Sequence, residues 1–230
     1  ESEGYDHTIE EVASIYEPQV LAACRTGPIV LGGYSFGVLV ALELALRLEQ
    51  AGREVPLLVS FDGFAPGFPK LLPASTRLAA HLREFGRRDL RGRGEYVRER
   101  LKNVKKRLHG KVDDEVFTPP AALDEKMQTR LRRVANGLWE ARDKYRPEQR
   151  AHCDVLLLKA SIPFDWSGSW SDPLYGWRHY VSGRIDAAIV PGEHLQLFRR
   201  ENDALMAEFL RARLRELAEC KQQLAEREAT

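Results

Sequence analysis

The first part of the chain alternates short apolar runs with amphipathic stretches, the pattern of an α/β protein. Thr8 and Glu11 have the spacing of a capping box and precede apolar residues at helical intervals, so we predict a helix from about Ile9 to Cys24. Pro18 is expected either to kink this helix or to mark its true start. A strand is predicted in GPIVLGGYSFG, a helix in VLVALELALRLEQAG ending at Gly52, and a second strand in VPLLVSFD. The last of these is almost continuously apolar, which indicates a parallel sheet covered on both faces.

Strand patterns are missing from Gly63 to Pro147. Two sets of apolar residues there repeat at intervals of four, three and four, namely Val97, Leu101, Val104, Leu108 and Met127, Leu131, Val134, Leu138. They predict two amphipathic helices, with a shorter one near Leu78. Strands are predicted again in CDVLLLKA and RIDAAIV, and helices over about 202–226. We therefore predict one α/β domain over residues 1–230, with a mostly parallel sheet and a helical lid at about 68–147.

Composition limits the classes of function that fit. The 230 residues are 43% hydrophobic and 30% charged with a net charge of +1, which is typical of a globular domain and gives no global sign of binding to nucleic acid or anionic membrane. The strongly apolar run at 38–46 is interrupted by Glu43, so no membrane-spanning helix is predicted. Cys24, Cys153 and Cys220 are odd in number and lack metal-ligand spacing, and no signal peptide opens the chain. These features favour a reducing, cytoplasmic setting and no metal site.

Gly33-Tyr34-Ser35-Phe36-Gly37 is a G-x-S-x-G motif between a predicted strand and a predicted helix. In a nucleophile elbow the serine lies in a strained turn, and we expect both glycines to be required because a Cβ at either would strike the neighbouring strand or helix. The turn would place Ser35 at the helix N-terminus, with the Phe36 N–H as one donor of an oxyanion hole. The alternative is a glycine turn that contains an incidental serine.

A serine nucleophile needs a base and a group that orients the base. Asp62 ends the strand VPLLVSFD, at the carboxyl edge of the sheet where Ser35 is also expected, and Asp165 is a rival orienter. Asp62 could instead cap a turn. His194 follows the strand RIDAAIV and reaches the same edge, in the chain order Ser, Asp, His of this architecture. The other histidines fit the role of base less well: His7, His81, His109, His152 and His179.

Several stretches together resemble the thioesterase domains of polyketide and nonribosomal peptide synthases, within the α/β-hydrolase superfamily. They are GGYSFGVLVALELALRLEQAG, LLVSFDGFAP, KYRPEQRAHCDVLLLKAS and WSDPLYGWRHYVSGRIDAAIVPGEHLQLF. The resemblance implies an α/β-hydrolase fold. It also implies a triad of Ser35 as nucleophile, His194 as base and Asp62 as orienter, with Tyr34 as a substrate-binding residue. The implied substrate is an acyl thioester on the phosphopantetheine arm of a carrier protein, released by hydrolysis or cyclisation without a metal or diffusible cofactor.

The chain departs from the family pattern in two respects. The family's first strands, and the loop that gives the second oxyanion N–H, precede the helix with which this chain begins, so we expect the N-terminal strands to be missing. The interval between Asp62 and His194 is also long for the family, which indicates an enlarged lid.

Residues 77–111 of that lid hold thirteen Lys and Arg against four Asp and Glu, an excess of nine positive charges. This stretch could dock an acidic carrier protein or be a solvated helix face, and few aromatics argue against nucleic acid. An aromatic group could line an acyl tunnel or belong to the core: Phe164, Trp166, Trp170, Tyr175 and Trp177. Two functions remain as rivals: a general carboxylesterase or lipase-like hydrolase, and an inactive carrier-docking module.

Overall fold

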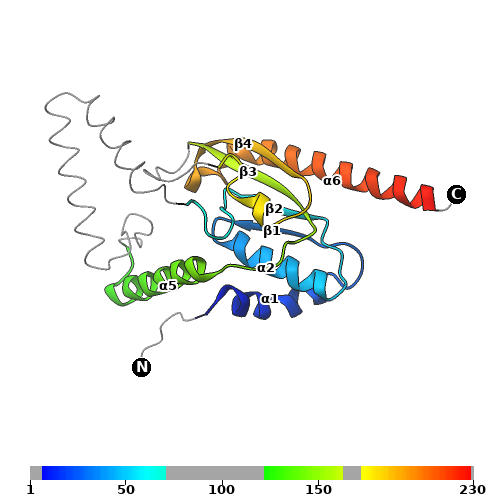
Figure 1. Ribbon diagram of the computed structural model, residues 1–230. Coiled ribbons are helices and arrows are strands. Elements are labelled where there is room, and N and C mark those ends of the chain that lie inside the picture. Colours follow the sequence, from blue (N-terminus) through cyan, green and yellow to red (C-terminus); the bar gives the residue numbers. More distant parts are fainter. Residues whose placement is uncertain (1–6, 71–121, 163–171, 229–230) are drawn as a thin grey trace, which may run out of the picture. The chain divides into compact units, whose positions relative to one another are not determined.

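The computed structural model describes residues 7–70, 122–162 and 172–228 (Figure 1). In chain order the helices are α1 (Ile9–Ala23), α2 (Gly37–Gln50), α5 (Glu125–Lys144) and α6 (Arg200–Glu228). The strands are β1 (Val30–Tyr34), β2 (Leu57–Phe61), β3 (Asp154–Ile162) and β4 (Ile185–Glu193). Single 3-10 turns occur at Trp177–His179 and His194–Gln196.

The described residues divide between two compact units. Residues 8–69, 142–162 and 172–228 form the unit that holds the sheet, and residues 122–141, most of α5, belong to the other. The helix predicted from the spacing of Met127 and its partners is confirmed as α5. The helices predicted around 97–108 and near Leu78 lie outside the described residues, as does most of the predicted lid.

The four strands form one parallel sheet in the order β1-β2-β3-β4. Leu58 on β2 is aligned with Leu31 on β1 and with Val155 on β3. Because the strands are parallel, the residues that follow β1, β2 and β4 leave the sheet at the same edge, where open α/β sheets place their sites. Within the described residues β1 pairs on one side only, so β1 and β4 are the two outer strands.

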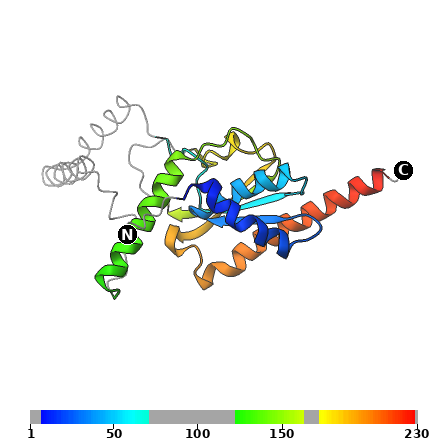
Figure 2. The same cartoon turned by 90° about the horizontal axis from the view of Figure 1, so that it is seen from below.

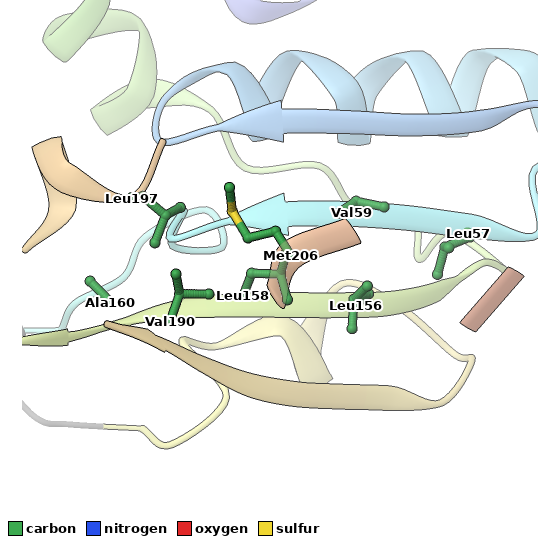
Figure 3. Close-up of a cluster of buried hydrophobic side chains, with 8 residues drawn as sticks. All are labelled: Leu57, Val59, Leu156, Leu158, Ala160, Val190, Leu197 and Met206. Carbon is green, nitrogen blue, oxygen red and sulfur yellow. The ribbon is translucent and has the colours of Figure 1, made fainter. Parts of the chain in front are cut away.

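Helices cover both faces of this sheet. Two perpendicular views show α1 and α2 on one face and α6 on the other (Figures 1 and 2). One buried cluster on the α6 side is formed by Leu57, Val59, Leu156, Leu158, Ala160, Val190, Leu197 and Met206 (Figure 3). Leu58, Val155 and Leu157 alternate with these residues along the strands and are also completely buried. The prediction of a parallel sheet buried on both faces is confirmed.

The ends of α1 and α2 follow local sequence signals. In the capping box of α1 the Thr8 N–H donates to Glu11 Oε2 (2.9 Å) and the Glu11 N–H donates to Thr8 Oγ1 (3.2 Å). The helix begins at Ile9 and runs through Pro18, so the alternative that Pro18 marks its start is wrong. The cap and the burial of Ile9 outweigh the one backbone donor that proline removes. The predicted end of α2 is confirmed, because Gly52 follows it with a φ of +74°.

The C-terminal segment is one continuous helix, α6, where the sequence suggested helices over about 202–226. Its buried Arg213 pairs with Asp154 at the start of β3 and donates to Glu216 (2.6 Å). Arg213 Nε also lies 3.5 Å from Asp186 on β4. These ion pairs tie α6 to the amino ends of β3 and β4.

Candidate active site

The G-x-S-x-G motif forms a sharp turn from β1 into α2. Ser35 has a φ of +53°, in a region that residues other than glycine rarely adopt. Its N–H donates to Phe61 O (3.0 Å), which ties the turn to the end of β2, and its carbonyl accepts from the Val38 N–H (3.3 Å). A Cβ at Gly33 would lie 2.3 Å from Val38 N, so the close approach of strand and helix requires glycine there. Strand, strained serine and helix together have the geometry that a nucleophile elbow requires.

Gly37 corrects one part of the prediction. A Cβ added at Gly37 would meet no atom within 4 Å, so this glycine is not required by close packing. The reason is its place as the first residue of α2, where the side-chain direction points into open space. Of the two glycines in the motif, only Gly33 is fixed by sterics.

Alanine substitutions at Gly33 and at Gly37 are expected to change the free energy of unfolding differently. Gly33→Ala is expected to lower the free energy of unfolding by about 3 kcal/mol or more, because backbone atoms of α2 must move away from the new methyl group. Gly37→Ala is expected to leave stability unchanged or raise it by up to about 1 kcal/mol, through the higher helix propensity of alanine. Urea unfolding of both variants measures the difference. Equal losses for the two variants would contradict the steric account.

The Phe36 N–H is available at the N-terminus of α2. Phe36 caps the helix with a φ of −55°, and in the part of the chain that the structure describes its N–H donates to no group. A free N–H at a helix N-terminus stabilises negative charge. The prediction that this N–H is an oxyanion donor therefore meets no competing hydrogen bond within the described residues.

Asp62 directly follows β2 and is held by several hydrogen bonds. It too has a positive φ (+51°), and its N–H donates to Leu158 O (2.7 Å). The residue is 8% exposed, and its Oδ1 accepts from the Ala160 N–H (3.0 Å) and from the Tyr175 hydroxyl (3.3 Å). The residue after it, Gly63, packs against the elbow, since a Cβ there would lie 2.7 Å from Ser35 O. Asp62 is thus fixed next to the turn that carries Ser35.

His194 follows β4 and forms a hydrogen-bonded pair with Asp62. Its Nδ1 lies 2.8 Å from Asp62 Oδ2, and both side chains are largely buried, at 15% and 9% exposure. An ionised carboxylate only accepts hydrogen bonds, so the proton lies on Nδ1 and the basic lone pair on Nε2. This is the arrangement in which a carboxylate sets the tautomer of a catalytic histidine.

Tyr34 links His194 to the elbow. Its ring stacks on the imidazole with 4.8 Å between centroids, and its hydroxyl donates to the His194 carbonyl (3.0 Å). Phe198 packs edge-on against the Tyr34 ring. Burial of Tyr34 raises the pKa of its hydroxyl above the usual value. The substrate-binding role of Tyr34 stays a prediction, and sequence reasoning missed this support of the imidazole.

Ser35 and His194 lie at the same edge, joined through Tyr34, but they are not hydrogen bonded to each other. Among the described residues the Ser35 hydroxyl makes no hydrogen bond to His194. Contacts between nucleophile and base are often long without substrate and tighten in the reacting complex. The structure therefore brings Asp62 and His194 into direct contact and places the serine turn beside them.

The other candidates lie elsewhere. His152 and Ser182 contact each other (3.2 Å) near the start of β3, at the opposite edge of the sheet. His179 stacks on Phe68, and His7 is exposed. His81, His109 and the rival orienter Asp165 are outside the described residues.

Trp177 is fully buried and its Nε1–H donates to Gly63 O (3.0 Å), which makes it a core residue that also holds the loop after Asp62. Phe164, Trp166 and Trp170, the further members of the aromatic group, lie outside the described residues. In the part of the chain that the structure describes, no cluster of three His, Cys, Asp or Glu side chains is placed to bind a metal ion. No described helix has the length and apolar character to cross a membrane.

Comparison with known proteins gives a consistent picture. The family model described as "Thioesterase domain" matches residues 1–214. The chain is 26% identical over 218 residues to a dimodular nonribosomal peptide synthase of Bacillus subtilis (strain 168), which covers 91% of the chain and 8% of that protein. It is 25% identical over 224 residues to the inactive atromentin synthetase invA4 of Paxillus involutus, covering 90% of the chain and 22% of that protein. The chain thus spans only a small part of these curated relatives.

Solved structures agree in fold. The NocB thioesterase domain, in a covalent complex with a fluorophosphonate nocardicin G analog, is 24% identical with a TM-score of 0.56, covering 93% of this chain and 78% of that chain. The thioesterase domain SrfTE, connected with the cyclization of surfactin, is 20% identical with a TM-score of 0.53, covering 86% and 74%. These are α/β-hydrolase folds, in agreement with the parallel sheet flanked by helices in this chain. The chain belongs to the thioesterase-domain family of nonribosomal peptide and polyketide synthases.

Proposed function

We propose that this chain is a serine thioesterase that releases an acyl chain, a polyketide or a peptide, from the phosphopantetheine arm of a carrier protein. Ser35 is the nucleophile, His194 the base and Asp62 the orienter. The observation that carries the proposal is the 2.8 Å contact between His194 Nδ1 and Asp62 Oδ2, beside the strained turn that holds Ser35. Two of the curated relatives are described as inactive, so the case for catalysis depends on these residues and not on family membership.

The first half-reaction forms an acyl-enzyme. His194 Nε2 takes the hydroxyl proton of Ser35 as Oγ bonds to the thioester carbon, and the carbonyl oxygen becomes an oxyanion that accepts from the Phe36 N–H. When the oxyanion collapses, the C–S bond breaks and the phosphopantetheine thiol leaves with the proton from Nε2. Asp62 stabilises the imidazolium between these two transfers.

The second half-reaction frees the acyl chain. Water, or a hydroxyl or amine of the acyl chain itself, attacks the ester carbon while Nε2 takes its proton. Water gives hydrolysis and an internal nucleophile gives cyclisation. The Ser35 oxygen leaves with the proton and the enzyme is restored. Each step uses a residue of this chain, and the phosphopantetheine arm belongs to the substrate, so the proposal includes no metal or diffusible cofactor.

Tyr34 is proposed to contact the acyl group, because it directly precedes Ser35 and stacks on His194. The carrier is proposed to dock at the basic stretch 77–111, because its excess of positive charge complements an acidic partner. This stretch and most of the lid at about 68–147 lie outside the described residues, so the argument for them rests on sequence. A cytoplasmic location is proposed as well, supported by three cysteines that are all free thiols.

Substrate preference tests the proposal against a carboxylesterase that has the same triad. The same acyl group is presented as a carrier-bound thioester, as a small-molecule thioester and as an oxygen ester. We expect kcat/KM for the carrier-bound thioester to be about 10-fold or more above the small thioester, and to fall toward it as salt is raised, because steering between opposite charges is screened.

Other outcomes identify the rival functions. Equal kcat/KM for the small thioester and the oxygen ester, with no preference for the carrier, would indicate a general carboxylesterase. Salt-sensitive binding of the carrier without turnover of any substrate would indicate an inactive docking module.

A further inference from the structure

Backbone strain singles out a residue that the proposed triad does not contain. Three non-glycine residues of the described chain have a positive φ: Ser35 (+53°), Asp62 (+51°) and Tyr175 (+54°). This conformation is unfavourable for a bulky side chain, and such strain concentrates at functional sites. The first two are the proposed nucleophile and orienter. The third is far from both in sequence, in the irregular segment between β3 and β4.

Local hydrogen bonds hold Tyr175 in this strained conformation. The carboxylate of Asp172 accepts from the Leu174 N–H and the Gly176 N–H, both at 2.9 Å. The Tyr175 carbonyl accepts from the Ala65 N–H (3.0 Å), which joins the segment to the loop after Asp62. The tyrosine is therefore built into position, and its geometry is not that of a loosely held surface residue.

The side chain of Tyr175 reaches the orienter. Its hydroxyl donates to Asp62 Oδ1 (3.3 Å), and its ring stacks on Phe64 with 4.1 Å between centroids. On β3, Lys159 donates to Pro173 O (2.8 Å) and places its ammonium 4.6 Å from the centre of the Tyr175 ring. Burial, and then the adjacent Asp62 carboxylate, raise the pKa of Tyr175 above its usual value, so the phenol keeps the proton that it donates.

The bonds to Asp62 are divided between its two oxygens. Oδ1 accepts from the Ala160 N–H (3.0 Å) and the Tyr175 hydroxyl, while Oδ2 faces His194 Nδ1. The terminal torsion of an aspartate is broad, so a carboxylate held at one donor can still turn. Two donors on Oδ1 from different segments fix the carboxylate plane and leave Oδ2 aimed at the imidazole.

We propose that Tyr175 is a positioning residue that fixes the Asp62 carboxylate and, through it, the catalytic tautomer and orientation of His194. The inference rests on the proposed function, in which Asp62 orients His194. Tyr175 touches neither the substrate nor the reacting atoms in this role. Its contribution is to the rate of the chemical step and not to the binding of the acyl group.

Tyr175→Phe removes the hydroxyl and keeps the ring with its contacts to Phe64 and Lys159. We expect kcat for a small thioester to fall about 10-fold with KM unchanged. This factor corresponds to the lower end of the range for a hydrogen bond to a charged group, because the 3.3 Å distance between the Tyr175 hydroxyl and Asp62 Oδ1 is long. Tyr145→Phe is the matched control. Tyr145 is also buried and donates to a carboxylate, Glu43 (2.9 Å), but away from the site, so this variant should keep wild-type kcat.

A double-variant cycle separates positioning from general destabilisation. If Tyr175 acts through Asp62, kcat of the double variant should be less than about 2-fold below kcat of the Asp62→Asn single variant. An unchanged kcat for Tyr175→Phe, or a full 10-fold effect on top of Asp62→Asn, would overturn the inference. If Asp62→Asn itself leaves kcat near wild type, the proposed triad fails instead, so the two failures are distinguishable.

Discussion

Ser35→Ala is expected to abolish covalent labelling by a fluorophosphonate probe and to lower thioesterase turnover by about 10⁶-fold, the scale for loss of a triad nucleophile. The probe phosphonylates a serine, with loss of fluoride, only when the hydroxyl is activated and the developing oxyanion is stabilised. It therefore tests Ser35, His194 and the Phe36 N–H together. Intact mass after incubation measures the result, with one probe adduct expected per wild-type chain and none on the variant.

The chain offers a matched control in Ser182, whose hydroxyl lies 3.2 Å from His152 Nδ1. This serine has a histidine neighbour but no nucleophile elbow, and it lies by the amino end of β3. Ser182→Ala should be labelled like the wild type. Loss of labelling at Ser182→Ala with labelling retained at Ser35→Ala would move the nucleophile to the opposite edge of the sheet and contradict the proposed function.

The pattern of apolar residues along the chain was sufficient to predict the parallel sheet and the helices that cover it. The nearly continuous apolar run of β2, interrupted by Ser60, is typical of a strand in a parallel sheet that helices cover on both faces, and the structure has this arrangement. Parallel strands then bring their carboxyl ends together. Asp62 and His194, which are 132 residues apart, could be predicted to lie at one edge for that reason, while Asp165 remained a rival orienter.

Contacts that depend on irregular backbone could not be predicted. Tyr175 reaches Asp62 from a segment without period or regular structure, across 113 residues, and only the turn around Asp172 aims its hydroxyl. Gly37 was misjudged because sequence shows that a glycine is present and not whether a methyl group has space there. Whether α1 begins before Pro18 depends on a balance of free energies. The cap at Thr8 and the burial of Ile9 favour the longer helix, the hydrogen bond lost at Pro18 opposes it, and the burial could not be known from sequence.

The strain at Ser35 follows from two constraints on the turn between β1 and α2. The turn must join a strand to a helix that packs closely on it. In addition, the Ser35 N–H donates a hydrogen bond to Phe61 O of the adjacent strand. A left-handed Ser35 is the conformation that satisfies both demands while the hydroxyl stays at the sheet edge. Asp62 repeats this solution one strand along, with its N–H bonded to Leu158 O. Packing of the sheet stabilises both strained residues, and the side chains needed for chemistry are held there.

Asp62→Asn is expected to lower kcat by about 10⁴-fold with KM little changed, through a reversal of the hydrogen bond to His194. An amide that keeps its Oδ1 bonds to Ala160 and Tyr175 presents an NH₂ group to Nδ1. Nδ1 must then accept, which moves the imidazole proton to Nε2, where it blocks uptake of the Ser35 proton. The volume of the side chain is unchanged, so the thermal midpoint should change far less than it would after loss of a core residue.

Single-turnover acylation, followed by intact mass with the fluorophosphonate probe, measures this effect directly. The Asp62→Asn variant should still be labelled at Ser35, but slowly, because the elbow and the Phe36 N–H are intact. Asp165→Asn is the comparison that decides between the two candidate orienters. If Asp165→Asn produced the large loss and Asp62→Asn fell less than 10-fold, the 2.8 Å contact of His194 with Asp62 would be structural and the orienter would be Asp165.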